Sequence, residues 1–97
     1  MSMSEDAETR VKKYITVVEN AIAGLIVHEN PVDTGKREVD TVLDLAERYL
    51  ADAKYYCAKG EASVALASIC YAEGLLDASR LLKFISIPGW SGRINRA

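Results

Sequence analysis

Histidine, proline and excess positive charge are all scarce in this sequence. Its 97 residues include one histidine and two prolines, and 12 Lys and Arg against 14 Asp and Glu give a net charge of -2. A single histidine, His28, excludes zinc sites built from several histidines and the paired Glu-x-x-His ligands of di-iron bundles. The balanced charge creates no overall positive field, so nucleic-acid binding would require a local basic patch.

Long apolar runs are also missing, and we expect no export signal. The longest apolar stretch is AIAGLIV, residues 21–27, which is far shorter than the ~18–20 residues that cross a bilayer. The first ten residues, MSMSEDAETR, are polar and acidic, whereas a secretory signal begins with basic residues and continues with an apolar core. We therefore expect a cytoplasmic protein with no membrane association.

The two cysteines, Cys57 and Cys70, are expected to be free thiols, as is usual in the cytoplasm. If Gly60 is the apex of a helical hairpin, the register of the two helices separates the cysteines by about 10 Å along the axis. This separation exceeds the ~7 Å limit for a disulfide. We interpret both cysteines as buried fillers of the apolar core.

Apolar residues recur at spacings of three and four, first from Val11 and then from Val39, which predicts amphipathic helices. Pro31 in the turn sequence NPVDTG and Gly60 are typical of the residues that follow helix ends. Pro88 stops the last helix. The predicted helices cover about residues 4–29, 35–59 and 62–86.

The short connections place neighbouring helices antiparallel. The predicted fold is therefore all-α, an up-down-up antiparallel three-helix bundle over residues 1–87, followed by a C-terminal tail at 88–97. The third helix is rich in Ala, Ser and Gly, and we expect it to be the most deeply packed. Gly74 lies in its middle, where glycine costs about 1 kcal/mol relative to alanine. We interpret Gly74 as a site of close packing against another helix, with a local bend of the third helix as the alternative.

Tyrosines on the three predicted helices fall at one level of the bundle. With neighbouring helices in antiparallel register, Tyr14, Tyr49 and Tyr71 lie within about one turn of a common cross-section. The sequence therefore predicts an aromatic cluster whose rings are buried while the hydroxyls reach a polar partner or the rim.

The stretch KYYCAKGEASVALASICYAEGLLDASRLL, residues 54–82, is similar to the signature region of a small archaeal family of uncharacterised proteins, the domain of unknown function numbered 357. Members of that family share a tyrosine pair, a Lys-Gly-Glu or Lys-Gly-Asp turn and a helix with the pattern YAEGLLDA. The resemblance extends over residues 11–85 and implies a three-helix bundle and an archaeal source. It implies no reaction and no catalytic residue.

Few residues suggest chemistry. His28 is expected to be solvated or to cap the first helix. The sequence TGKR, residues 34–37, lacks the first glycine and the preceding strand of a phosphate-binding loop. Glu73, Asp77 and Arg80 are spaced by about one helical turn, which suits either a polar site or surface ion pairs, and we treat them as the weaker polar candidates.

We therefore expect a non-enzymatic interaction or accessory module, without a cofactor or metal, that self-associates as a homodimer or docks on another protein. The alternative is an RNA- or nucleotide-associated protein that uses Arg10, Lys12 and Lys13 with the tail arginines Arg93 and Arg96. An exposed apolar patch would favour the first hypothesis, and a contiguous basic strip the second. The candidate interaction surface consists of Leu81, Leu82, Phe84, Ile85, Ile87 and Trp90.

Overall fold

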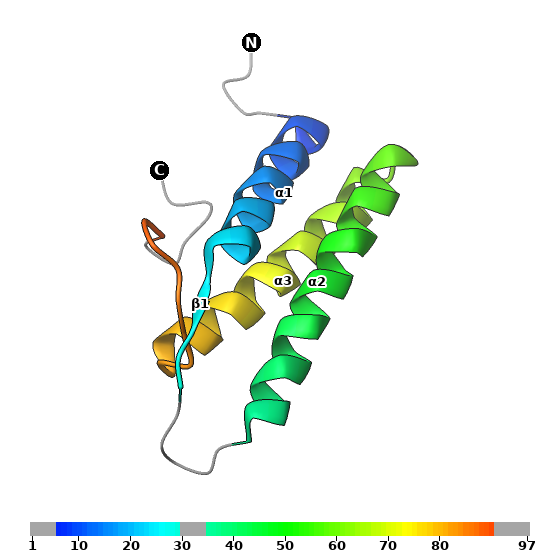
Figure 1. Cartoon of the computed structure of the whole chain (residues 1–97). Coiled ribbons are helices and arrows are strands. Elements are labelled where there is room, and N and C mark those ends of the chain that lie inside the picture. The colour runs from blue at the N-terminus through cyan, green and yellow to red at the C-terminus, as the bar shows by residue number, and fades with distance from the viewer. Residues whose placement is uncertain (1–5, 30–34, 91–97) are drawn as a thin grey trace.

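Three helices packed side by side dominate the computed structural model, which describes residues 6–29 and 35–90 (Figure 1). They are α1 (Ala7–Gly24), α2 (Lys36–Ala58) and α3 (Ala62–Leu81). Each helix runs antiparallel to the one before it, and α3 contacts both α1 and α2. The predicted all-α, up-down-up three-helix bundle is confirmed.

Helix α1 is shorter than predicted at its C-terminal end. Its first turn is capped by Asp6, whose carboxylate accepts a hydrogen bond from the Thr9 backbone N–H at 2.8 Å, and this bond lowers the pKa of Asp6. The helix ends at Gly24, because Leu25 adopts an extended conformation with φ -70° and ψ 153°. The predicted extension to residue 29 is therefore wrong, and the predicted start at residue 4 lies outside the described residues.

Helices α2 and α3 end with the same backbone arrangement. After α2, Gly60 has a φ of 78°, and the Glu61 N–H donates to the Tyr56 carbonyl at 2.9 Å, which is a Schellman motif. After α3, Lys83 takes the same left-handed conformation with a φ of 66°, and the Phe84 N–H donates to the Ser79 carbonyl at 2.9 Å. The glycine was predicted as a stop, whereas the lysine was not, so the predicted extension of the third helix to residue 86 is wrong.

The segments that follow α1 and α3 pair as a short antiparallel ladder, although the sequence shows no strand periodicity. Strand β1 (Ile26–Val27) pairs with β2 (Ile85–Ser86), with Ile26 opposite Ser86 and Val27 opposite Ile85. The His28 N–H extends the ladder by donating to the Phe84 carbonyl at 2.8 Å. Figure 1 shows β1, in cyan, beside the orange segment that leaves α3. This ladder ties the two segments together at one end of the bundle.

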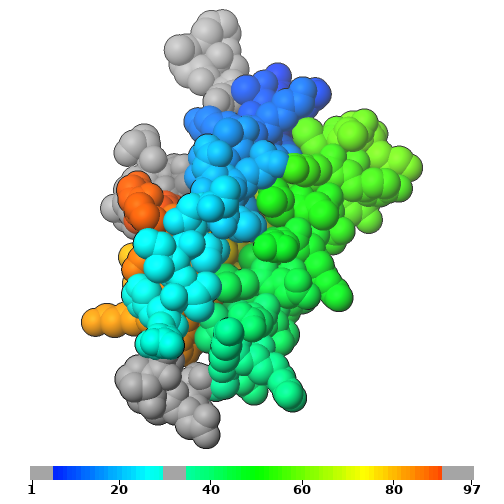
Figure 2. All heavy atoms as spheres, in the orientation of Figure 1, coloured from blue at the N-terminus to red at the C-terminus, as the bar shows by residue number. Residues whose placement is uncertain are grey.

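The core lies where the inner faces of the three helices meet. Four alanines of α2 and α3 belong to this core and are completely buried: Ala46, Ala53, Ala65 and Ala72. Larger side chains from all three helices complete the core, and α3 supplies two that are completely buried, Ile69 and Leu76. From the side drawn in Figure 2, α1 and α2 cover most of α3. The inner face of α3 is deeply packed, but five residues are buried on α3 and five on α1, so the prediction that α3 is the most deeply packed helix is not confirmed.

The aromatic and cysteine predictions are confirmed in part. The rings of Tyr49 and Tyr71 meet edge to face with centroids 4.5 Å apart. Tyr14 is buried in the core, but within the described residues its ring contacts neither of the others, so the predicted three-ring layer is a pair.

Both cysteines are free thiols. Cys57 is half-buried, whereas Cys70 is exposed, so the buried-filler interpretation is wrong for Cys70.

Over the part of the chain that the structure describes, none of the helices has the length and apolar character needed to cross a bilayer.

Candidate interaction surface

The six apolar residues predicted as an interaction surface do not lie together on the outside. Leu81 and Leu82 are 63% and 65% exposed. Ile85 and Ile87 are buried in the core of the chain itself, and Phe84 and Trp90 are half-buried against that core. The left-handed turn at Lys83 explains this division, because it ends α3 and carries the residues that follow into the ladder with β1.

The exposed face of α3 carries an apolar stripe that extends well beyond the two exposed leucines of the predicted set. The sequence alone did not reveal it. The residues recur at alternating spacings of three and four, which keeps them on one side of a helix from its first turn to its last. None of them carries a charge. The opposite face of the same helix points into the core. We call this set the α3 stripe: Val64, Ala67, Tyr71, Gly74, Ala78 and Leu81, all exposed.

The α3 stripe is bordered by α2 on one side. Tyr71, which is 51% exposed, rests its ring edge to face on the Tyr49 ring of α2, so its position is supported from within the chain. Cys70 flanks the stripe, and partial burial together with the nearby Glu73 raises the pKa of its thiol. The thiol of Cys70 is therefore held in its neutral form, and it lacks the low pKa of a reactive cysteine.

Gly74 forms an opening in the middle of the α3 stripe. A Cβ added at this position would have no heavy atom within 4 Å outside its own helix surroundings. The interpretation of Gly74 as a point of close packing is therefore wrong within the chain, because α1 and α2 pack on the other face of α3. The position is exposed, and its lack of a side chain leaves a gap between neighbouring side chains of the stripe.

Two of the weaker polar candidates, Asp77 and Arg80, form an ion pair on α3. The Arg80 guanidinium contacts Asp77 Oδ1 through Nη2 at 2.7 Å and through Nε at 3.1 Å, and both side chains are half-buried. Glu73 lies one turn before Asp77 and is also half-buried. Among the described residues, no three His, Cys, Asp or Glu side chains come close enough to hold a metal ion.

His28 has a structural position that sequence reasoning missed. Its Nδ1 lies 2.9 Å from the Lys83 carbonyl oxygen and its Nε2 lies 2.6 Å from Ser86 Oγ. A carbonyl only accepts, so Nδ1–H donates to Lys83, and in the neutral imidazole Nε2 accepts from the Ser86 hydroxyl. The ring thus joins the end of β1 to β2, and the predicted role as a cap of the first helix is wrong. No local signal could have shown this, because its partners are 55 and 58 residues away.

Comparison with known protein families identifies the family of this chain. Residues 13–85 match the family described as Protein of unknown function (DUF357). The chain belongs to the DUF357 family. No curated protein and no solved structure matches it. The DUF357 match begins within α1, contains all of α2 and α3, and ends in β2, so it includes the whole α3 stripe.

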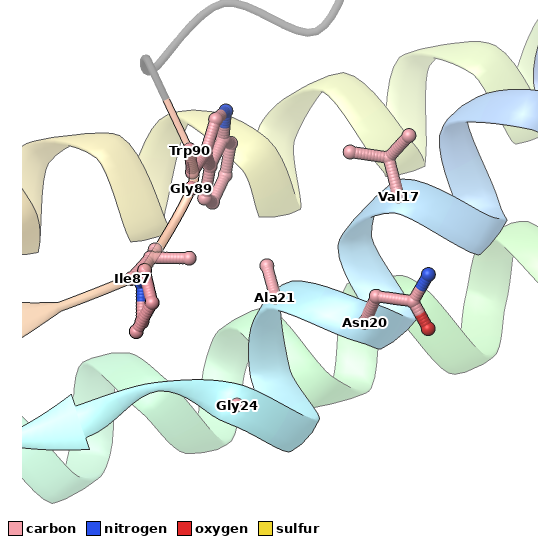
Figure 3. Close-up of a pocket in the computed structure, with 8 residues that line it drawn as sticks. Val17, Asn20, Ala21, Gly24, Ile87, Gly89 and Trp90 are labelled. Carbon is pink, nitrogen blue, oxygen red and sulfur yellow. The ribbon is translucent and has the colours of Figure 1, made fainter.

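A shallow pocket lies at the edge of the DUF357 region, between α1 and the segment after β2. It has a volume of about 340 Å³, and Figure 3 shows the Ala21 side chain pointing toward the segment with Ile87 and Trp90. The indole Nε1 of Trp90 is buried and has no hydrogen-bond partner among the described residues. The lining offers few polar groups to orient a ligand: Val17, Asn20, Ala21, Gly24, Ile87, Pro88, Gly89 and Trp90.

One basic residue of the alternative hypothesis is paired with a carboxylate. Lys12 Nζ lies 3.2 Å from Glu8 Oε2, and Glu8 raises the pKa of this lysine through a hydrogen bond and its charge. Arg10 is half-buried and Lys13 is exposed on α1. Arg93 and Arg96 lie outside the described residues. On α1 of this DUF357 chain, acidic side chains therefore interrupt the positive charge.

Proposed function

We propose that this DUF357 chain is a non-enzymatic interaction module of the cytoplasm, which self-associates or docks on a partner protein through the α3 stripe. The observation that supports the proposal most is the α3 stripe itself, an exposed face without charge along the full length of a helix. A solvated helix face in a globular protein is normally polar. An apolar face that stays exposed is typical of an interaction surface.

The neighbouring helix provides the contrast within the same molecule. The exposed positions of α2 are mostly charged, as expected for a face that stays in water. Both helices expose a face of similar length to solvent, but only the exposed face of α3 lacks charge. We therefore assign the docking surface to α3 and not to α2. The exposed charged residues of α2 are Lys36, Arg37, Glu38, Asp40, Asp44, Glu47, Arg48, Asp52 and Lys54.

The RNA- or nucleotide-associated alternative has less support. Lys12 pairs with Glu8 at the surface of α1, and Lys54 of α2 pairs with Glu19 of α1. Each carboxylate offsets a positive charge that would otherwise attract phosphate. The geometry around these lysines is that of surface ion pairs between and along helices.

Glutamate in the α3 stripe should abolish self-association without unfolding the chain. Ala78→Glu places a charge within the apolar face, and its desolvation opposes any docking there. The matched control is Ala51→Glu on the charged face of α2, which is also exposed and undergoes the same change in helix propensity. Sedimentation velocity over a range of concentrations, with circular dichroism to verify folding, measures both effects.

We expect the unmodified chain and Ala51→Glu to increase in sedimentation coefficient with concentration, while Ala78→Glu remains a monomer. Equal behaviour of the two variants would contradict the assignment of the α3 stripe as the docking surface. A monomer at every concentration of the unmodified chain would contradict self-association.

A further inference from the structure

The α3 stripe complements itself. Resting on the proposed function, we propose that the partner is a second copy of this chain, and that the two α3 helices pair antiparallel about a two-fold axis. In this arrangement Tyr71 of each chain packs over the partner's Gly74. The axis passes the helix between residues 72 and 73, in the middle of the α3 stripe.

The register follows from the spacing of the stripe. In an antiparallel helix pair, residues face each other when their numbers have a common midpoint. Val64 and Leu81 share the midpoint between residues 72 and 73, Ala67 and Ala78 share it, and Tyr71 and Gly74 share it as well. All six residues of the α3 stripe therefore pair in one register, and a two-fold axis repeats each contact.

The sizes of the facing side chains match in this register. Tyr71 is the largest residue of the α3 stripe and faces Gly74, where a side chain would meet open space. Ala67 faces Ala78, and this small pair allows the helix axes to approach to about 8 Å, the lower end of the usual range. A parallel pair would set Tyr71 against Tyr71 and Gly74 against Gly74, which combines a steric clash with a void. Side-chain volume therefore selects the antiparallel orientation.

Charges at the two ends of the stripe select the same orientation. Glu61 precedes α3 and Lys83 follows it, and both are exposed. In the antiparallel pair each Glu61 lies within about one residue of the level of the partner's Lys83, so each end of the pair carries both signs of charge. A parallel pair would bring like charges together. The ends therefore favour the antiparallel pair, and the uncharged middle does not oppose it.

The length of α3 limits the strength of this association. Its 20 residues span about 30 Å, and one helix pair of that length buries less than the ~800 Å² per partner of a standard interface. The exposed Leu82 and the Tyr49 ring beside the stripe widen the contact. We therefore expect a reversible dimer that dissociates at micromolar concentrations.

Disulfide cross-linking between two single-cysteine variants tests the orientation and the register. In a Cys57→Ser, Cys70→Ser background, Ala67→Cys and Ala78→Cys are prepared separately. In the proposed dimer Ala67 faces the partner's Ala78, whereas identical positions are 11 residues apart, about 16 Å along the axis. Mild oxidation of the mixture should produce a covalent heterodimer, and each variant alone should remain a monomer on a non-reducing gel.

The outcomes separate this inference from the proposed function. Cross-linking of each variant with itself would show a parallel pair and overturn the inference, while interaction through the α3 stripe would stand. A dimer that Ala78→Glu dissociates, but that never cross-links in the mixture, would overturn the register alone. A monomer in every preparation would overturn self-association together with the inference.

Discussion

At the scale of single residues, two left-handed positions end two helices with the same hydrogen bonds, but with different side chains. Gly60 has a φ of 78° and Lys83 a φ of 66°. Glycine adopts this region without a steric penalty, whereas the Cβ of any other residue is crowded there. The signal that marked the end of α2 is therefore missing at the end of α3. This explains why the sequence predicts one boundary and misplaces the other.

Lys83→Gly should stabilise the chain. Removing the steric crowding of the left-handed lysine should raise the free energy of unfolding by about 1–2 kcal/mol. The greater conformational freedom of glycine in the unfolded state lowers it by about 0.5–1 kcal/mol. The control is Gly60→Lys, which forces a side chain into the equivalent position after α2. Urea denaturation of monomeric protein should show a higher midpoint for the first variant and a lower midpoint for the second. A lower midpoint for Lys83→Gly would contradict the Schellman motif at the end of α3.

Gly74→Ala should also stabilise the monomer, contrary to the close packing predicted from the sequence. The added Cβ meets open space, so helix propensity decides the result and raises the free energy of unfolding by up to about 1 kcal/mol. The measurement is chemical denaturation at a concentration where the chain is monomeric. The methyl group should weaken dimerisation at the same time, because it occupies the space proposed for the partner's Tyr71. Stability and association should therefore change in opposite directions, and a destabilised monomer would contradict the exposure of this site.

At the scale of elements, local patterns predicted the helices but not the ladder between β1 and β2. An amphipathic helix repeats its apolar period over many residues, so the three helices are visible in the sequence. Each strand has two residues, too few to show a period, and its partner lies about 60 residues away. The His28 side chain contacts the segment that follows α3, and this contact could not be predicted from the sequence for the same reason. Contacts between distant segments leave no local signal.

The sequence predicted the helix that carries the candidate surface, but not which side of that helix is exposed. α3 is apolar on nearly all sides, so its sequence does not show which residues α1 and α2 cover. The structure buries Ala65, Ile69 and Leu76 and leaves Tyr71 and Ala78 exposed. This division depends on where α1 and α2 pack. Leu81 was in the predicted set, whereas the rest of the α3 stripe required the fold.

At the scale of the whole molecule, α3 uses small residues on two opposite faces for two purposes. Inward, its Ala65 and Ala72 are completely buried and lie in one core with Ala46 and Ala53 of α2, so the two helices pack closely along their length. Outward, Ala67 and Ala78 are exposed in the stripe proposed to contact a second chain. Similar substitutions on the two faces should therefore have different consequences.

Leucine at an inward alanine should destabilise the bundle, whereas leucine at an outward alanine should not. Ala72→Leu adds three carbons to a completely buried site, and this overpacking costs about 1–3 kcal/mol, or about 4–8 °C in Tm for each kcal/mol in a domain of this size. Ala67→Leu makes the same change on the exposed face, where the effect on monomer stability should stay within about 0.5 kcal/mol. Thermal denaturation at low concentration separates the two faces. Equal losses would show that α3 is rotated about its axis relative to the packing described, and the α3 stripe would then belong to the core.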